Sequence, residues 1–550
     1  MSILDSFSEL RECIEQPTRS PAPRPHLLQT KHDVNPVPHL LSVQNITTTR
    51  AEILQAMPDR SVVDRHVFAY FNRLSPVFTH RPSFLRQYES FWKNPSAAPV
   101  MWVSILYSIM CLMPLEHATS PSSAGDTLSD QSRYLAQVVQ CLILGDYSRG
   151  GPFTIEALLH YFMVEHSRRR DADTSNWALS GLIIRLALHK GYHREPSLFP
   201  NITPYDGELR RRVWMVLYFI DAVISIQMGL PRLIKDEQCD TGFPHNLLDT
   251  DFDEDTAALP TPRSDAEITP IQWWVAKYKL LIMIARIADM SLLNIGDGDA
   301  SSDAKVKQAD TLLRATYDQI QPSMKFTSLV NCLGASPETI VGRLSVSLLF
   351  LKGLIILHRG YVVGSEPAET RSSFILHNDS AAAPDSARIC IEAALQMLEY
   401  QDLIYYESQE GGAIASLSWR LRSSSIAHEF FTATSVLCSY MYRVYIRDPG
   451  IPQLPQEQIQ AIERALVRTH GTWQSQRAVL KDAQTMTEIL GLLLAKLQER
   501  ADGCGTTPRV MDNILDIPLG SGSEDLGALL QDNFGLYGEG MNDFSSFIGW

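Results

Sequence analysis

One short stretch carries the densest group of acidic residues in the chain: Asp249, Asp251, Asp253, Glu254 and Asp255. Alternating carboxylates can present several oxygen atoms to a hard cation. An EF-hand loop that starts at Asp249 would need Gly at its sixth position and Glu at its twelfth, where this chain has Glu254 and Pro260. Because the group lies between Pro244 and Pro260, we expect a solvated loop. An all-α, metal-dependent, cyclase-like enzyme that uses these carboxylates is kept as an alternative.

A second pattern with chemical meaning is the pair His189 and His193, whose i,i+4 spacing is typical of two metal ligands on one helix. Gly191 lies between them and Pro196 follows, so the helix is predicted to end before the two rings can share a face. The chain has no G-x-S-x-G sequence, no P-loop and no G-x-G-x-x-G sequence after a strand. We therefore predict no catalytic residue, no metal site and no cofactor.

The eight cysteines are scattered, and no two of them lie within 20 residues of each other. This spacing excludes zinc sites built on C-x2-C pairs, in which two thiolates must reach one ion. A disulfide framework is not expected either, because the chain has 550 residues, few cysteines and no apolar signal core at its start. Buried free thiols in a reducing compartment are expected.

Two runs of three arginines, at 168–170 and 210–212, could suggest contact with nucleic acid. Three successive side chains on a helix point in three directions, and Glu208 offers local pairing, so we predict that 210–212 lies at a solvated helix start. Asp221 is different, because it is the only charged residue between Val213 and Leu230. Burying a carboxylate alone costs several kcal/mol, so we predict that Asp221 pairs with a buried arginine, with Arg185 as the first choice.

The elements that must position these residues are predicted to be helices from about residue 60 to 500. Apolar residues recur three and four apart in 306–320, 387–400, 458–470 and 484–500, and 177–189 is apolar on most sides. No internal repeat interrupts this pattern. The favoured fold class is all-α, with a large multi-helix regulatory domain at 60–500. Surface loops at 120–129 and 246–264 are predicted to interrupt its helices.

The two ends of the chain differ from this helical part in composition. Residues 1–59 are rich in proline and polar residues and are predicted to be a disordered segment or linker. The apolar runs 100–113 and 344–357 are too short to span a membrane, and Lys352 interrupts the second, so we predict a soluble protein with no membrane contact.

Residues 501–550 are predicted to be a disordered acidic-aromatic tail. After Arg509 there are seven acidic residues and no Lys or Arg, so half of the net charge of −14 lies in the last 41 residues. Bulky apolar groups alternate with the acids, among them Phe534, Phe544, Phe547 and Trp550. This composition is typical of activation segments that dock into apolar grooves on partners. The alternative is an ordered terminus that packs its aromatic rings onto the core.

Three blocks of sequence resemble the fungal-specific transcription factor domain, the middle homology region of fungal zinc-cluster regulators. They are the stretch from Tyr70 to Phe84, the stretch from Trp177 to Arg194, and the stretch from Glu208 through Trp214 to Asp249. The signature positions of these blocks are Pro76, His80, Phe84, Trp177, Gly181, Arg185, Arg211, Trp214, Asp221, Gly229 and Pro231. The resemblance covers roughly residues 60–440.

The resemblance implies an all-helical regulatory domain that acts in the nucleus and controls transcription, often of a metabolic or secondary-metabolite gene cluster. It also implies that the tail contacts the transcription machinery. Members of the family usually carry an N-terminal cluster of six cysteines that binds zinc and reads DNA, but here only Cys13 precedes Cys111. We therefore expect DNA contact to be absent or supplied by a partner.

Three explanations stay open for the missing cluster: a DNA-binding partner, a gene model without its first exon, or a member that lost DNA binding. A protein that titrates related regulators is a further alternative. The helical domain could also form a homodimer through one of its amphipathic faces.

Overall fold

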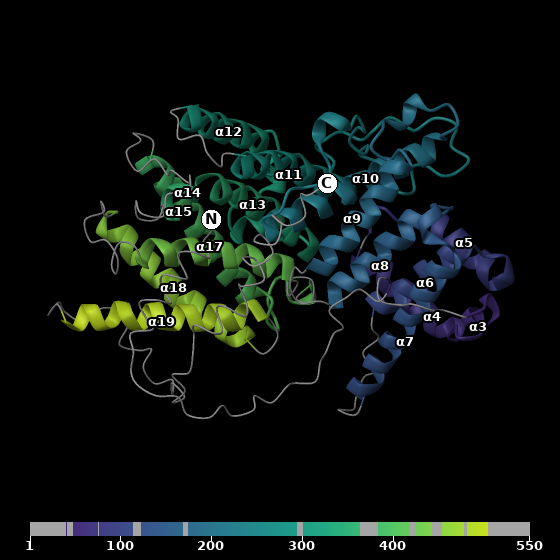
Figure 1. Ribbon diagram of the computed structural model, residues 1–550, viewed down its shortest axis with the longest axis horizontal. Helices are drawn as coiled ribbons and strands as arrows, with labels where there is room; N and C mark the ends of the chain where they lie inside the picture. Colours follow the sequence, from purple (N-terminus) through teal and green to yellow (C-terminus); the bar gives the residue numbers. More distant parts are fainter. Residues whose placement is uncertain are drawn as a thin grey trace, which may run out of the picture. The chain divides into compact units, whose positions relative to one another are not determined.

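The computed structural model describes residues 40, 48–74, 76–113, 123–168, 174–293, 301–363, 383–417, 424–442, 454–477 and 481–503 (Figure 1). The regular elements in these ranges are α-helices, short 3-10 turns and one π-helical turn at Tyr70–Leu74, with no strand among them. The predicted all-α fold class is therefore confirmed. The acidic tail and most of the N-terminal segment lie outside the described residues.

The described residues form two compact units, which divide between Leu281 and Ile282 within one long helix. We call them the first unit, up to Leu281, and the second unit, from Ile282 onward. The sequence predicts one domain over 60–500 and shows no sign of this division. The predicted boundaries at 59/60 and 500/501 stay predictions, although α4 begins at Arg60 and α19 ends at Gly503.

The first unit is built on a helix that is apolar on all sides. Its helices are α3 (Arg50–Gln55), α4 (Arg60–Ala69), α5 (Arg81–Lys93), α6 (Val100–Leu112), α7 (Ser123–Leu144), α8 (Thr154–Arg168), α9 (Thr174–His189), α10 (Pro204–Met228) and the first half of α11 (Pro270–Leu293). Every residue of α6 from Met101 to Cys111 is buried, and α6 packs against α7 and α8. A helix without a polar face can only be the centre of a core.

Two predictions about this unit are corrected by its helices. The segment predicted to be disordered up to residue 59 contains α3, which begins with a capping box in which Thr49 and Glu52 bond each other's backbone N–H, and which buries Ile53. The loop predicted at 120–129 is replaced from Ser123 onward by α7. Small polar residues at the start of α7 resembled a loop because helix propensity is only a weak preference.

The second unit is built on α13 (Pro337–His358), which packs against α12 (Ser301–Asp318), α15 (Ala383–Glu407) and α17 (Ser424–Tyr442). The remaining helices are the second half of α11, α14 (Gly360–Val363), α18 (Gln456–Gln476) and α19 (Lys481–Gly503). The helices predicted at 387–400, 458–470 and 484–500 are confirmed within α15, α18 and α19, and the one predicted at 306–320 is confirmed as far as Asp318, where α12 ends.

Helix α13 has the length and apolar composition of a membrane span, the one helix of this kind in the described ranges, and 78% of its most apolar window is buried inside the structure. Lys352 lies on α13, is buried, and donates from Nζ to Glu429 of α17 at 2.6 Å. Burial of the Glu429 carboxyl raises its pKa, and the Lys352 ammonium opposes that rise. Such a buried ion pair is the kind of contact that the core helix of a folded unit makes.

Candidate functional site

The three sequence blocks meet in the first unit at a long connection between α10 and α11. We call residues 229–269 the clamped loop, because side chains from other elements hold it at intervals along its length. Its one helical piece is the 3-10 turn Asp236–Gln238. The predicted loop at 246–264 is confirmed as part of this connection.

The clamped loop begins at Gly229, which ends α10 in the left-handed conformation with φ of 66°. Asp221, 3% exposed on α10, then accepts backbone N–H groups from Leu233 at 3.2 Å and Ile234 at 2.7 Å. Burial raises the pKa of Asp221, and these two donors partly offset the rise. The prediction that Asp221 pairs with Arg185 is wrong, since Arg185 is exposed on α9. The Asp221 carboxylate is satisfied because the chain after Gly229 turns back toward α10 and presents its backbone N–H groups.

Arg232 fixes the next part of the loop by a buried triangle of polar groups. Its Nη1 donates to the Tyr218 hydroxyl and to Asp236 Oδ1, both at 2.9 Å, and Tyr218 itself donates to Asp236 at 2.8 Å. Burial raises the pKa of Tyr218, so its hydroxyl keeps its proton and acts as the donor. The triangle ties the loop to the middle of α10.

At the centre of the site, Glu208 of α10 is completely buried and accepts four hydrogen bonds. They come from Arg212 Nε at 3.3 Å, from the His245 backbone N–H at 3.1 and 3.3 Å, and from His245 Nδ1 at 2.7 Å. The His245 ring therefore carries a proton on Nδ1. A carboxylate with no solvent access is tolerated because every bond reaches it from a group already fixed by the fold.

Arg212, 2% exposed, joins the first and third sequence blocks. It donates to Asp249 Oδ1 at 2.6 Å and to the carbonyl oxygens of Leu247 at 3.3 Å and Val77 at 3.4 Å. The prediction that 210–212 is a solvated helix start is therefore wrong for its second and third arginines. Both are drawn inward because acidic partners from distant segments meet them there.

Arg211 makes the corresponding link to the second block. It pairs with Glu195, which also accepts N–H groups from Gly242 at 2.9 Å and Ser197 at 3.3 Å. Burial alone would raise the pKa of Glu195, but Arg211 and the backbone donors outweigh this effect and lower the pKa from 4.5 to about 2. Beside it, Arg194 binds both oxygens of Asp240 at 3.1 and 3.0 Å.

His80 is placed at the start of α5 and caps that helix. Its Nδ1 lies 2.8 Å from the Ser83 hydroxyl, and Ser83 in turn receives a hydrogen bond from Tyr205 at 2.8 Å. The His80 ring packs against Phe252 of the clamped loop, with 4.8 Å between ring centroids. Burial lowers the pKa of His80, and the nearby Asp249 partly opposes this. The predicted signature residue thus binds the clamped loop through its ring.

The acidic group of the clamped loop is less solvated than predicted. Asp249 pairs with Arg212, Asp251 pairs with Arg263 at 2.7 Å, and Glu254 pairs with Arg86 of α5. In the described ranges, no cluster of three or more His, Cys, Asp or Glu residues has the arrangement of a metal site. The three paired carboxylates act as anchors for the loop, which removes the feature that favoured the cyclase-like alternative.

The other signature residues support this arrangement by packing. Trp214 is buried in α10 and Phe84 is buried in α5, where its ring contacts Phe71 and Trp102. A Cβ at Gly181 would lie 3.4 Å from Leu233, an ordinary van der Waals distance, so Gly181 faces the clamped loop although the contact does not require glycine. Three further signature residues are less buried: Trp177 and Pro76 are half-buried, and Pro231 is exposed.

The two histidines with metal-like spacing do not share a helix, because α9 ends at His189, as predicted. The residues proposed for activation, Phe534, Phe544, Phe547 and Trp550, lie outside the described residues. Sequence reasoning missed Glu195, Arg232, His245 and Arg263. The available signal was the i,i+4 spacing of Glu208 and Arg212 directly before the apolar stretch of α10, because charged groups beside a buried stretch need partners.

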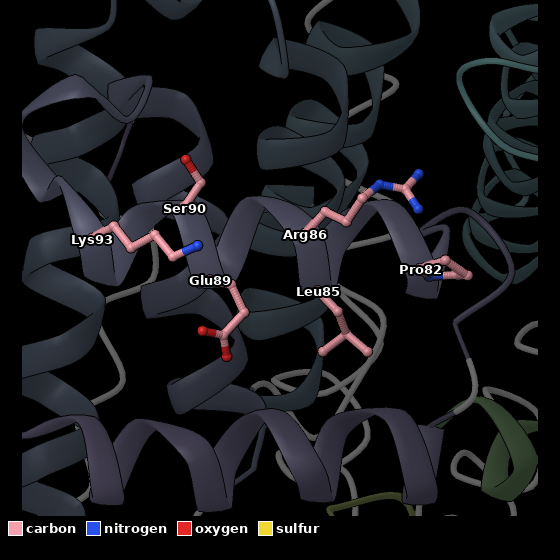
Figure 2. Close-up of a pocket in the computed structure, with 6 residues that line it drawn as sticks. All are labelled: Pro82, Leu85, Arg86, Glu89, Ser90 and Lys93. Atoms are coloured by element: carbon pink, nitrogen blue, oxygen red, sulfur yellow. The ribbon is translucent and has the colours of Figure 1, made fainter.

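An open groove follows the outer face of α5, and Figure 2 shows the six side chains along it. They are Pro82, Leu85, Arg86, Glu89, Ser90 and Lys93. Two of the charged ones already have partners, since Arg86 pairs with Glu254 and Glu89 pairs with Arg60 at 2.5 Å. Leu85, Ser90 and Lys93 are exposed beside these two surface ion pairs.

The charges of the site neutralise one another, so the chemistry of the arrangement is structural. Carboxylates of α10 and of the 190–203 connection meet guanidinium and backbone N–H groups, and each contact fixes one point of the clamped loop. The result is a loop of about 40 residues that these contacts hold at several points against the helices.

Comparison with known proteins gives the family context. The family described as "Fungal specific transcription factor domain" matches residues 68–321, which contain all three sequence blocks. A Zn(2)-C6 fungal-type transcription factor of Monascus ruber is 34% identical over 91% of this chain and 60% of its own length. The equisetin cluster transcription factor of Fusarium heterosporum is 32% identical over 92% of this chain and 71% of its own length.

A transcription factor of Chaetomium globosum is 30% identical over 89% of this chain and 85% of its own length. The chain spans between half and two thirds of the length of several other curated relatives that it matches. No solved structure matches it. The resemblance seen in the sequence is confirmed.

Proposed function

The chain belongs to the family of fungal-specific transcription factors, and from this we propose that it regulates transcription of a metabolic or secondary-metabolite gene cluster in the nucleus. The proposal is supported by the names of relatives that match most of the chain. They include the pyrrolocin cluster, equisetin cluster and fusarisetin A cluster transcription factors. The matched stretch 68–321 contains the whole clamped loop, so the buried charge network lies within the residues that match the family.

We propose that DNA contact by residues 1–550 is absent or is supplied by a partner. Residues 1–110 contain a single cysteine, Cys13, and cannot form a cluster that needs six. The net charge of −14 also makes non-specific attraction to phosphates weak over the chain as a whole. In the second case the helical units are the regulatory part, and the partner delivers them to a promoter.

We propose further that residues 501–550 recruit the transcription machinery. The composition supports this proposal, because seven acids and no Lys or Arg follow Arg509. The aromatic residues among these acids would provide the docking energy.

One genetic experiment tests the regulatory role. The gene is deleted in the organism that carries it, and the transcripts of the neighbouring biosynthetic genes are measured against distant control genes. We expect transcripts of the cluster to change at least about tenfold, with restoration by the intact gene. If no cluster changes while the deletion is complete, the proposed function is wrong.

A second experiment tests the tail. The full chain is fused to a foreign DNA-binding domain and assayed on a reporter gene, beside a variant with Phe544, Phe547 and Trp550 changed to Ala. We expect the triple variant to lose most of the activation, whereas Asp543→Asn, a matched change of one acid, should lose little. Equal activation by the triple variant and the parent fusion would contradict the role of the aromatic residues.

A further inference from the structure

The described residues contain four Ser/Thr-Pro pairs, and three of them precede helices. Thr203 donates to Asp206 at 2.8 Å before α10, and Thr269 is buried and donates to Asn246 at 2.6 Å before α11. Ser336 receives the Thr339 N–H at 3.3 Å before α13. In each case proline occupies the first helical position and the hydroxyl is engaged.

The fourth pair, Thr261-Pro262, has a different environment. No helix follows it, and Thr261 is exposed, with a hydroxyl that bonds no other group in the described part of the chain. Pro260 and Pro262 fix their own φ angles and favour extended backbone at the residues before them. The pair therefore lies in an extended, exposed segment that no helix needs as a cap.

Both ends of this segment are held in place. On one side, the Thr256 hydroxyl accepts the Asp253 backbone N–H at 2.9 Å and donates to the Asp253 carboxylate at 3.0 Å. On the other side, the Arg263 backbone N–H donates to Asn246 at 3.0 Å, and its guanidinium binds Asp251 at 2.7 Å and Glu267 at 3.1 Å. A partner that binds residues 257–262 meets a segment whose ends are already fixed, which lowers the entropy cost of binding.

Arg263 is a cation two residues beyond Thr261, and its side chain is 28% exposed. Side chains two residues apart in extended backbone lie on the same face, so the exposed part of this guanidinium is on the side of Thr261. A phosphate on Thr261 would add about −1.5 to −2 charges and three strong acceptor oxygens beside this cation. It would then compete with Asp251 for Arg263, which is one of the anchors of the clamped loop.

We propose that Thr261 is a phosphorylation site for a proline-directed protein kinase that uses ATP. The Thr261 Oγ1 attacks the γ-phosphorus of ATP, the new P–O bond forms as the bond to the β-phosphate oxygen breaks, ADP leaves, and the hydroxyl proton passes to a base of the kinase. The phosphate then pairs with Arg263 and loosens the Asp251 anchor. The site lies outside the family signature residues and does not depend on the proposed function.

The first test compares the folded chain with peptides. The full chain is incubated with ATP and a proline-directed kinase, and phosphate is located by mass spectrometry, beside four synthetic peptides that each contain one of the pairs. We expect all four peptides to be modified, but in the folded chain only Thr261 among these four pairs, with loss in Thr261→Ala and at least about tenfold slower transfer in Pro262→Ala. Thr203 serves as the matched control, since it has the same dipeptide at a helix cap. Modification of the capping pairs at the rate of Thr261, or none at Thr261 when its peptide is modified, would overturn the proposal.

The second test measures the phosphate itself. The second pKa of the phosphate on Thr261 is followed by phosphorus NMR in the phosphorylated chain and in two variants. Arg263→Gln should raise that pKa because the cation is lost, whereas Asp251→Asn should lower it because Arg263 is released to the phosphate. Circular dichroism confirms that each variant keeps its helices. An unchanged pKa in Arg263→Gln would exclude Arg263 as the partner.

Discussion

Replacing Arg212 by methionine should be one of the most damaging single substitutions in the clamped loop and its supports. Arg212 donates to Glu208, to Asp249 and to the carbonyl oxygens of Val77 and Leu247, so it holds three separate segments. Methionine fills much of the same space but donates nothing. Glu208, which is completely buried, would then keep its charge with only His245 and the more distant Arg211 nearby.

The magnitude follows from this burial. Removing one partner of a buried ion pair costs about 3–5 kcal/mol, because the other charge stays without compensation. The exposed pair between Arg86 and Glu254 holds the same loop but is open to water, so Arg86→Met should cost about 0–1 kcal/mol. At about 2–4 °C per kcal/mol for a unit of this size, the expected loss in melting temperature is about 6–20 °C for Arg212→Met and at most about 4 °C for Arg86→Met.

Melting followed by circular dichroism provides the first measurement, and trypsin cleavage after Arg263 provides the second. Cleavage should be faster in Arg212→Met at temperatures well below melting, since the loop is then less firmly held. Adding Glu208→Gln to Arg212→Met should recover part of the loss, because the uncompensated charge is removed. If Arg212→Met and Arg86→Met melt within about 2 °C of each other, the buried network does not hold the loop in the way described here.

The remaining predictions concern pH and one backbone position. The folded-state pKa of Glu195 is about 2, below its ordinary value of 4.5, so its contribution to stability is present above pH 4.5 and lost as pH falls toward 2. Glu195→Gln should flatten acid unfolding curves in that range, and an unchanged curve would show that the ion pair with Arg211 is not formed. Burial lowers the pKa of His160 from 6.5 to about 4, partly offset by its bond to the Glu156 carbonyl, so stability is fully present above pH 6.5 and falls as the pH drops to 4; His160→Gln should lack this slope, and a slope equal to that of the parent would exclude His160 as its source. Gly229→Ala should cost about 1 kcal/mol and Gly229→Asn less, measured by melting, because the residue has φ of 66°; equal stability of Ala and Gly would mean that the left-handed cap is not kept in solution.

Much of the fold could be predicted from the sequence, because helical periodicity is a local property. Apolar residues three and four apart predict α12, α15, α18 and α19 directly, and the uninterrupted apolar run of α6 predicts a buried central helix. The bounds were less certain, since α7 begins at Ser123 inside a stretch that resembled a loop. The division into two units at Leu281 was not visible, because it falls within the continuous helix α11.

The candidate site was only half visible. The sequence blocks named His80, Arg211, Asp221 and Gly229, and the burial of Asp221 was predicted from its apolar neighbours. Its partner was not, because a carboxylate can be satisfied by an arginine or by backbone N–H groups, and only the path of the chain after Gly229 decides which.

The sequence by itself determined the helical class, the family, the buried charge on α10 and the acidic character of the last 41 residues, since each is a property of composition, spacing or motif. Only the tertiary structure decided that Glu208, Arg212 and Asp249 form one network. It also decided that Arg263 anchors the clamped loop two residues from Thr261, whose exposed hydroxyl bonds no other group in the described part of the chain. The physical reason is that an ion pair depends on distances between segments far apart in the chain, and a sequence pattern fixes only the order of those segments.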